Sequence, residues 1–216
     1  MTDDRNDPSP ARFDDSWQRC WAGLQAKGDG AAVRDALLAA YAEPQRSYHT
    51  LQHLSECLAL FDAHRHLAVE PAEVEIALWF HDAIYAVRAS DNEARSADWA
   101  EAELRKAGVT EARISRVRSH ILATRHSALP EGNDQALLVD IDLSILGAPR
   151  ARFEEYERQV REEYRWVPGF LFHLKRRQIL AQFLARDALF NTPAMRAALE
   201  AAARGNLAES LRNAKA

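Results

Sequence analysis

Apolar residues recur along most of the chain at intervals of three and four positions, which is the spacing of one face of an α-helix. Trp17, Trp21 and Leu24 show this spacing near the N-terminus. Alternation with a period of two, the pattern of a half-buried strand, is essentially missing, so no strand is predicted. The periodicity predicts helices over residues 17–24, 33–41, 49–64, 71–85, 90–106, 111–124, 135–146, 149–166, 170–190 and 193–212. The expected fold class is therefore all-α.

The breaks between these helices indicate a single domain. Pro71 suits the first turn of a helix, where its missing N–H costs nothing, and Gly108 is a natural C-terminal stop. The helix after Pro71 is apolar nearly all round, which is typical of a helix buried at the centre of a bundle. The polar loop 126–134 is too short to link two domains. We expect a disordered lead-in over residues 1–15, which are polar and acidic, and one helical-bundle domain over residues 16–216.

Composition narrows the class of protein further. The 216 residues are 47% hydrophobic and 28% charged, as in ordinary soluble globular domains. The 28 basic and 32 acidic residues give a net charge of -4, which disfavours stable nucleic-acid binding because such domains are usually basic. No apolar run approaches the ~18 residues of a membrane span, and the N-terminus does not resemble a signal peptide, so we expect no membrane partner and a cytoplasmic location. Cys20 and Cys57 are too few for a thiolate metal cluster and are expected to be buried and free.

The candidate chemistry lies in histidine and aspartate residues. They gather in short segments, namely His49 to His53, His81-Asp82, His120 with His126, and Asp140-Ile141-Asp142. His49 and His53 are four positions apart and would share one face of a helix. His81 and Asp82 would point about 100° apart around their helix, yet both could reach a cation lying between them. Imidazole nitrogen and carboxylate oxygen together suit Zn, Mn, Fe, Ni and, with more oxygen, Mg.

The positions of two aspartates favour a metal site. Asp82 closely follows the most apolar stretch of the chain, residues 76–80, and Asp142 lies in the apolar segment 137–143. A buried carboxylate without a partner is heavily penalised, so a cation or an ion pair must be nearby. Each histidine taken alone is more often a satisfied core residue than a ligand. Two carboxylates in two apolar helices together with histidines, however, are what a metal site inside a helical bundle requires.

The combination of these segments resembles the HD superfamily of metal-dependent phosphohydrolases. It is most similar to the bacterial family described as predicted HD-superfamily phosphohydrolases, over about residues 41–211. The combination is specific for the superfamily, whereas each segment alone is not. The motifs that carry the resemblance are Tyr48-His49-xxx-His53, Trp79-Phe80-His81-Asp82-xx-Tyr85, Asp91-Asn92-Glu93-xx-Ser96-Ala97 and Asp140-Ile141-Asp142-Leu143. The fold that it implies is a helical bundle of the HD-domain type.

The resemblance implies a divalent metal cofactor, which would be Mn, Fe, Ni, Zn or Mg, as one ion or two. His49 matches the histidine that protonates the leaving group in cyclic-nucleotide phosphodiesterases of the superfamily, so its implied role is general acid. A second ion would take histidines from the interval between the two aspartates. His126 is the preferred contributor there, and His120 is either another one or a solvated residue. The implied ligands of the first ion are His53, His81, Asp82 and Asp142.

Two departures from the superfamily pattern matter. Several superfamily phosphatases have a glutamate that orients the attacking water three residues after the aspartate, and here that position is Tyr85. Glu93 is expected to take over this role, or else to be a helix N-terminal residue favoured by the dipole, and the two are compatible. The histidine that often follows the His-Asp pair closely in dinuclear members is missing before His120.

The expected function is hydrolysis of a small phosphoester by a metal-activated water, with monoesters, diesters and nucleotides among the candidates. Arg125 and Arg177 are expected to hold the phosphate, and the alternative for the basic cluster 175–177 is a solvated helix surface. Two other functions stay open. One is a di-iron oxygenase of the same superfamily, and the other is a non-catalytic metal- or nucleotide-binding module, which the missing glutamate favours. The sequence determines neither the substrate nor the oligomeric state, and a homo-oligomer stays open.

Overall fold

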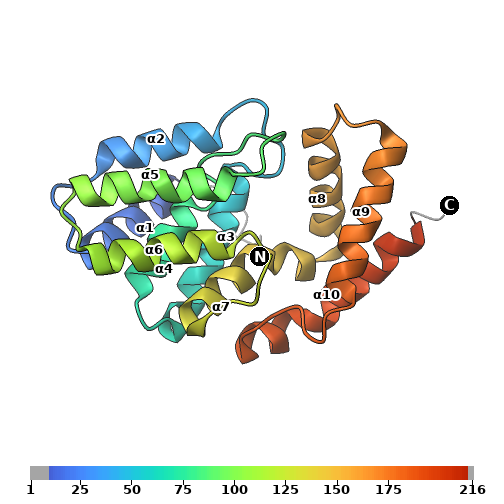
Figure 1. Ribbon diagram of the computed structural model, residues 1–216. Helices are drawn as coiled ribbons and strands as arrows, with labels where there is room; N and C mark the ends of the chain where they lie inside the picture. Colours follow the sequence, from blue (N-terminus) through green and yellow to red (C-terminus); the bar gives the residue numbers. More distant parts are fainter. Residues whose placement is uncertain (1–9, 214–216) are drawn as a thin grey trace.

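The computed structural model describes residues 10–213, and all regular structure in this range is helical (Figure 1). The prediction of an all-α fold is confirmed. Two of the helices, η2 and η3, are short 3₁₀ segments. In chain order the elements are α1 (Pro10–Gly23), α2 (Ala31–Tyr41), α3 (Leu51–His64), η2 (Arg65–Leu67), α4 (Pro71–Phe80), α5 (Asn92–Lys106), α6 (Glu111–Ala123), α7 (Gly132–Asp142), η3 (Leu143–Gly147), α8 (Arg150–Glu163), α9 (Gly169–Leu184) and α10 (Pro193–Asn213).

Helix α4 lies at the centre of a bundle formed by α1 to α7. It packs against α1, α3, α5, α6 and α7, and residues 73–80 on it are all buried. Trp79 packs edge-on against the rings of Phe13 and Trp17 from α1. A helix that contacts neighbours on all sides needs apolar residues on all sides, which explains the apolar run after Pro71.

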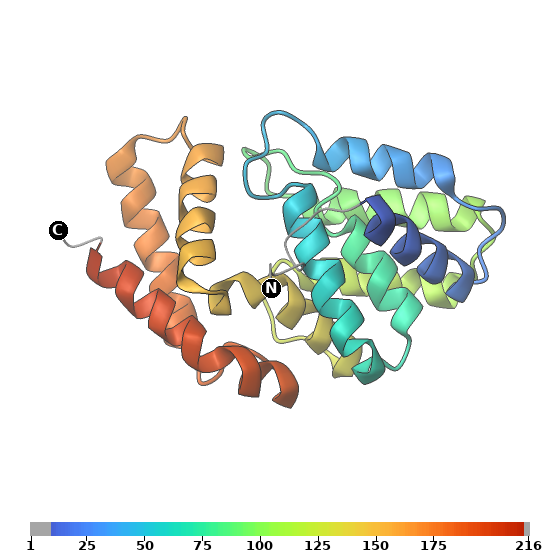
Figure 2. The same ribbon diagram turned by 180° about the vertical axis from the view of Figure 1, so that it is seen from behind.

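Helices α8 to α10 form an arm at one side of the bundle (Figures 1 and 2). The short η3 connects the arm to α7, and α10 packs against η3 and α9. Asp140, near the end of α7, accepts hydrogen bonds from the backbone N–H groups of Asn191 and Thr192 at 2.7 and 2.6 Å. Because these two residues directly precede α10, the buried carboxylate fixes the start of that helix to the bundle.

Helix α3 begins later than the periodicity predicts. Its first residue is Leu51, because the Thr50 side chain accepts a hydrogen bond from the backbone N–H of Gln52 and caps the helix. His49 therefore precedes the helix, and the expectation that His49 and His53 share a helical face is wrong. Their rings nevertheless lie close together, with centroids 5.9 Å apart.

Helix α4 ends earlier than predicted, at Phe80. His81 and Asp82 therefore lie in the turn that follows, and the expectation that they project from one helix is wrong. The buried guanidinium of Arg46 donates hydrogen bonds to the carbonyl oxygens of Asp82 and Ala83 at 2.6 and 2.8 Å. The Arg46 side chain thus satisfies the carbonyl groups of the turn after α4. In a longer helix, backbone N–H groups of the next turn would have satisfied them.

The prediction of a disordered lead-in is wrong for residues 10–15. Helix α1 begins at Pro10, and Phe13 on it is buried against α4, which provides the apolar contact that orders this segment. Residues 1–9 of the predicted lead-in lie outside the described range. Among the described helices, none combines the length and the hydropathy that crossing a bilayer would require.

Candidate metal centre

Four residues that were predicted as ligands lie together in the structure. His53 comes from α3, Asp142 ends α7, and His81 and Asp82 lie in the turn after α4. One donor atom of each lies within 4.8 Å of the others. His53 Nε2 is 3.1 Å from His81 Nε2 and 3.4 Å from Asp142 Oδ1, and Asp82 Oδ2 is 3.1 Å from His81 Nε2. We call these residues the quartet.

The spacing of the donor atoms fits one metal ion. His81 Nδ1 donates a hydrogen bond to the Leu78 carbonyl oxygen at 2.8 Å, so Nε2 is the ring nitrogen left to bind either a proton or a cation. That nitrogen lies 3.1 Å from His53 Nε2, and two lone pairs at this distance repel unless a proton or a cation lies between the rings. Atoms bound about 2.0–2.2 Å from one ion lie roughly 3 to 3.5 Å from one another, which matches the quartet. A divalent cation therefore fits this set of donors.

The carboxylates of the quartet are held in the ionised state. Burial raises the pKa of Asp142, but hydrogen bonds from His126, His53 and His81 outweigh this effect and hold the pKa well below its ordinary value. Burial likewise raises the pKa of Asp82, and the charge of His81 and the other imidazoles lowers it by more. Two largely buried negative charges require positive charge beside them, which a divalent cation supplies.

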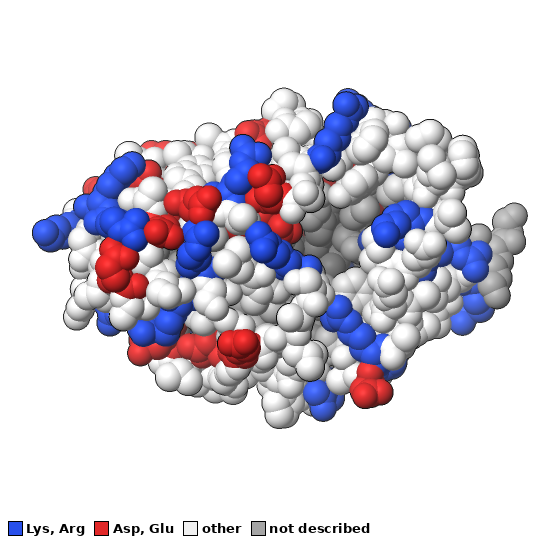
Figure 3. Space-filling model, viewed as in Figure 1, with Lys and Arg blue, Asp and Glu red and all other residues white. Residues whose placement is uncertain are grey.

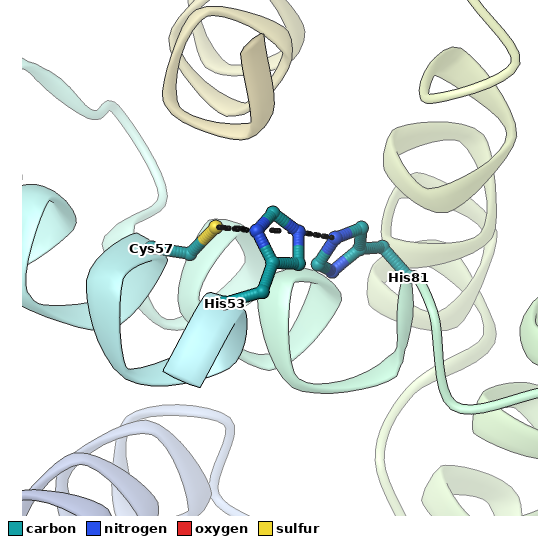
Figure 4. A group of neighbouring side chains, drawn as sticks. All are labelled: His53, Cys57 and His81. Atoms are coloured by element: carbon teal, nitrogen blue, oxygen red, sulfur yellow. Dashed lines mark hydrogen bonds between the residues drawn. The ribbon is translucent and has the colours of Figure 1, made fainter. Parts of the chain in front are cut away.

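Cys57 offers an alternative donor beside His53, on the side away from His81 (Figure 4). Its Sγ lies 3.8 Å from Nδ1 and 3.7 Å from Nε2 of His53. An atom nearly equidistant from both ring nitrogens lies off the axis of either lone pair, so the thiol is poorly placed to share an ion with His53 Nε2. The quartet is therefore the better site. Cys20 and Cys57 are both buried and free, as predicted.

His49 is held by Glu163, the last residue of α8, which the sequence did not single out. His49 Nδ1 lies 2.8 Å from Glu163 Oε2, and Oε1 accepts hydrogen bonds from the backbone N–H groups of residues 47–49. Burial raises the pKa of Glu163, but these hydrogen bonds, led by the one from His49, lower it to about 2. The carboxylate therefore fixes Nδ1 as a protonated nitrogen of His49 and leaves Nε2 as the nitrogen that can exchange a proton.

A signal for Glu163 exists in the helical pattern. Phe153, Tyr156 and Val160 form the buried face of α8, and Glu163 occupies the next position on that face, three residues after Val160. A carboxylate at a core position needs hydrogen-bond donors, so its position alone indicates a structural or functional partner. That partner is 114 residues away in the chain, and no spacing rule connects the two.

Arg46 is a second residue of the site that the sequence did not reveal. Its guanidinium donates hydrogen bonds to the carbonyl oxygens of Asp82 at 2.6 Å and His49 at 3.2 Å, and it lies over the ring of Tyr85. Tyr85 in turn stacks on His49, with ring centroids 3.9 Å apart, and donates a hydrogen bond to Glu163. Arg46 therefore joins the segment of the predicted general acid to the segment of a predicted ligand. Nothing in the polar stretch before α3 indicates this role.

Of the two histidines predicted for a second ion, the structure brings one to the quartet. His126 Nε2 lies 3.1 Å from Asp142 Oδ2, and its backbone has a φ of 53°, which is uncommon for a residue other than glycine. His120 is buried on α6, where burial lowers its pKa. Its charged neighbours are Asp134 and Arg116 rather than members of the quartet.

A cleft of about 730 Å³ opens between the bundle and the arm. It is visible as a hollow near the centre of Figure 3, with basic side chains on its rim. Asp82, Asp142 and His49 line it, so the quartet can be reached from solvent. Glu93, in the first turn of α5, lines it too, which is compatible with both roles predicted for this residue.

The basic side chains of the cleft differ in part from the prediction. Arg125 lines the cleft, whereas Arg177 does not. Lys175 lies two positions earlier on α9 and does line it, because residues two apart on a helix point to nearly opposite sides. Arg88 and Arg176 line it as well, but the Arg88 guanidinium lies over the ring of Trp166 and Arg176 is paired with Glu157. A phosphate in the cleft would therefore meet Arg125 and Lys175 first.

The resemblance of the motifs to HD phosphohydrolases stays a prediction. Comparison of the chain with protein-family models, with curated proteins and with solved structures found no match. The function therefore has to be inferred from the donor atoms of the quartet, from the charge around them and from the shape and lining of the cleft.

Proposed function

We propose that this chain is a metal-dependent phosphohydrolase that acts on a small phosphoester bound in the cleft. The observation that carries the proposal is a pair of imidazole nitrogens 3.1 Å apart, flanked by two ionised carboxylates, at a cleft with basic side chains. The residues that would hold the ion are His53, His81, Asp82 and Asp142. A bound divalent ion supplies Lewis-acid polarisation of a phosphoryl oxygen and lowers the pKa of a water molecule.

His49 is the proposed general acid. With Nδ1 hydrogen-bonded to Glu163, its Nε2 delivers a proton to the oxygen of the leaving alcohol. The stacked ring of Tyr85 limits rotation of the imidazole. Since the Tyr85 hydroxyl donates to Glu163, the role of orienting the water falls to Glu93.

Arg125 and Lys175 are proposed to hold the phosphate from opposite walls of the cleft. Arg125 follows α6 in the bundle, and Lys175 lies on α9 in the arm. Arg125 Nε is 3.9 Å from Glu93 Oε2, so the carboxylate that would orient the water also positions this guanidinium. Cations that line a cleft raise the local concentration of an anionic substrate and thereby speed its association.

The contact between His126 and Asp142 favours one alternative, a centre with two metal ions. Asp142 Oδ1 faces the quartet and Oδ2 faces His126, so this carboxylate is placed to bridge two ions. A di-iron oxygenase would need such a bridge. About two equivalents of iron per chain, with an optical spectrum that changes on exposure to oxygen, would support it. A redox-inert metal together with phosphoester hydrolysis would refute it.

Elemental analysis and a phosphatase assay test the main proposal. Full-length protein would be purified without chelator or tag metal, beside Asp142→Ala and the control Asp35→Ala, which removes an exposed carboxylate on α2. We expect about one or two equivalents of divalent metal in the wild type and the control, and loss of the metal in Asp142→Ala. Hydrolysis of p-nitrophenyl phosphate or of its bis ester should follow the same pattern. A wild type that holds no metal after reloading with Mn, Fe, Ni, Zn and Mg would refute the proposal.

A further inference from the structure

The two walls of the cleft differ in chemistry. The bundle wall carries Asp82, Asp142, His49 and Arg125, which are the groups that would handle the metal and the phosphate. The arm wall carries two cations, Lys175 and Arg176, but is otherwise mainly hydrocarbon, and its lining includes Val160, Trp166, Leu171, Phe172, Ile179 and Phe183. A ligand that fills the cleft would therefore meet the candidate metal ligands on one side and a largely apolar surface on the other.

Few neutral side chains of the cleft offer hydrogen bonds to a ligand. Apart from the tyrosines and the indole of Trp166, the lining in the described part of the chain has two that can make them, Asn92 and Thr124, and both already have backbone partners. The Asn92 amide accepts from the Ala86 N–H and donates to the Ala86 carbonyl oxygen, at 3.0 and 3.1 Å. The Thr124 hydroxyl donates to the Ile121 carbonyl oxygen at 2.7 Å. These bonds leave Asn92 one N–H and Thr124 only its accepting lone pairs, which is little with which to recognise the edge of a base or the hydroxyl groups of a sugar.

Among the described residues, the buried hydroxyl of Tyr48 in the lining has no hydrogen-bond partner. The Tyr48 ring lies 4.8 Å from the ring of His53, so it sits beside the quartet. A group in this position would meet the phosphate rather than the organic part of a substrate.

The apolar arm wall continues out of the cleft onto an exposed surface of the arm. Among the described residues, four of the six large hydrophobic side chains that are exposed lie within residues 166–174. They are Trp166 (48% exposed), Phe170 (73%), Leu171 (44%) and Leu174 (57%). Trp166 and Leu171 belong to both the cleft lining and this surface. Contiguous exposed apolar surface of this kind marks a binding site more often than it marks ordinary protein surface.

We infer that the substrate is a phosphorylated amphiphile, an alkyl or aryl phosphate whose hydrocarbon lies along the arm wall. The hydrolytic part of this inference rests on the proposed function, whereas the binding part does not. The phosphate would lie at the quartet between Arg125 and Lys175, and the chain would leave the cleft past Leu171 and Trp166. Nucleotides and sugar phosphates are disfavoured, because their polar groups would lose hydrogen bonds to water and would meet mainly hydrocarbon on the arm wall.

The reaction releases an alcohol and inorganic phosphate. The oxygen of water forms a bond to phosphorus, and the bond between phosphorus and the ester oxygen breaks. The ester oxygen takes a proton from His49 and leaves as the alcohol. One proton of the water stays on the phosphate, and the other restores the proton of His49. No oxidant, reductant or second substrate is needed.

A chain-length series tests this inference. We would measure kcat/KM for n-alkyl phosphates from ethyl to octyl, below their aggregation concentrations, with the metal that elemental analysis identifies. The expected rise is about twofold per methylene, since an open cleft realises only part of the roughly fourfold that full burial of a methylene would give. Leu171→Ser should lower the ratio of octyl to ethyl phosphate several-fold. The control Val69→Ser, at an exposed apolar residue outside the cleft lining, should leave that ratio unchanged.

A binding experiment separates this inference from the proposed hydrolysis. Calorimetric titration of the full-length protein with n-alkylphosphonates, which are not hydrolysed, should give a Kd that falls with chain length. A Kd independent of chain length, or nucleoside monophosphates hydrolysed with a higher kcat/KM than octyl phosphate, would overturn the inference and leave the hydrolase intact. Chain-length-dependent binding without hydrolysis of any phosphoester, whichever metal is supplied, would support the apolar subsite and refute the hydrolase.

Discussion

Replacement of Glu163 by glutamine should destabilise the protein and release His49, the proposed general acid, from its orienting partner. The change keeps the shape of the side chain, but it removes the negative charge and puts an amide nitrogen where one acceptor oxygen stood. Both carboxylate oxygens are in use, because Oε1 accepts three backbone N–H groups and Oε2 is bonded by His49 and Tyr85. Glutamine has a single carbonyl oxygen, which can accept either from the three backbone N–H groups or from His49 and Tyr85. The other group of donors loses its acceptor.

The magnitude follows from the pKa of Glu163. A pKa of about 2, against an ordinary value of 4.5, corresponds to about 3 kcal/mol in favour of the folded state when the group is ionised. Because the folded-state pKa is the lower one, this contribution is fully present above pH 4.5 and is lost as the pH falls towards 2. The free energy of unfolding of Glu163→Gln should therefore be lower than that of the wild type by up to about 3 kcal/mol at pH 7. The difference should shrink by roughly 1 kcal/mol at pH 3.5.

Urea unfolding at the two pH values, together with kcat for the best phosphoester, measures both effects. Glu162→Gln is the matched control, because Glu162 is an exposed neighbour on the same helix, paired with Arg165 on the surface. The control should change the free energy of unfolding by less than about 1 kcal/mol and leave kcat unchanged. In Glu163→Gln, kcat should fall at least about tenfold while the metal content stays at the wild-type level. Equal stability of Glu163→Gln and wild type at pH 7 would refute this account of the carboxylate.

Three further predictions concern other parts of the structure. Arg46→Ala should lower the free energy of unfolding by about 3 kcal/mol or more in urea titrations, since three buried or partly buried carbonyl groups lose a charged donor. An effect below about 1 kcal/mol would contradict the role assigned to Arg46. A chelator should lower the Tm of the wild type by roughly 5 to 10 °C and leave that of Asp142→Ala unchanged, because the ion stabilises only a folded quartet; equal shifts would show binding elsewhere. Gly30→Ala should cost at least about 2 kcal/mol more than Gly28→Ala, and equal losses in calorimetry would contradict this. Both glycines have positive φ, but a Cβ at Gly30 would lie 2.6 Å from the Trp21 ring, and one at Gly28 would meet nothing within 4 Å.

The sequence predicts best what depends on local spacing. The helical periodicity gave the all-α fold, and the apolar run after Pro71 gave the central helix α4. Asp82 and Asp142 could be singled out as parts of one site because they follow or interrupt apolar segments, where an unpaired carboxylate is unfavourable. The full set of four candidate ligands came from the resemblance of the motifs, and the structure brings these four residues together. A buried charge in an apolar run is a local signal, and it needs no knowledge of the tertiary structure.

The predictions that failed depend on distant contacts. Helix α4 stops at Phe80 because Arg46, more than 30 residues earlier, supplies donors to the carbonyl groups beyond it. His49 is oriented by Glu163, 114 residues later. On α9, Arg177 was expected to hold the phosphate, but Lys175 lines the cleft instead, because the packing of the arm sets which side of α9 faces the cleft. Periodicity assigns a residue to a face of its helix, but it does not show what that face meets.

The short helix η3 separates, along the chain, the residues of the quartet from the residues of the arm wall. All four members of the quartet precede Gly147, whereas Glu163, Lys175 and the apolar wall all follow it. If the proposed function holds, the residues that would retain the ion and the wall that would select the organic part of the substrate are thus encoded in separate stretches of sequence. Substitutions in the arm would then change the substrate, or the orientation of His49, without altering an atom of the quartet. Related chains should therefore vary most in the arm, and a new specificity would arise there while the quartet stays the same.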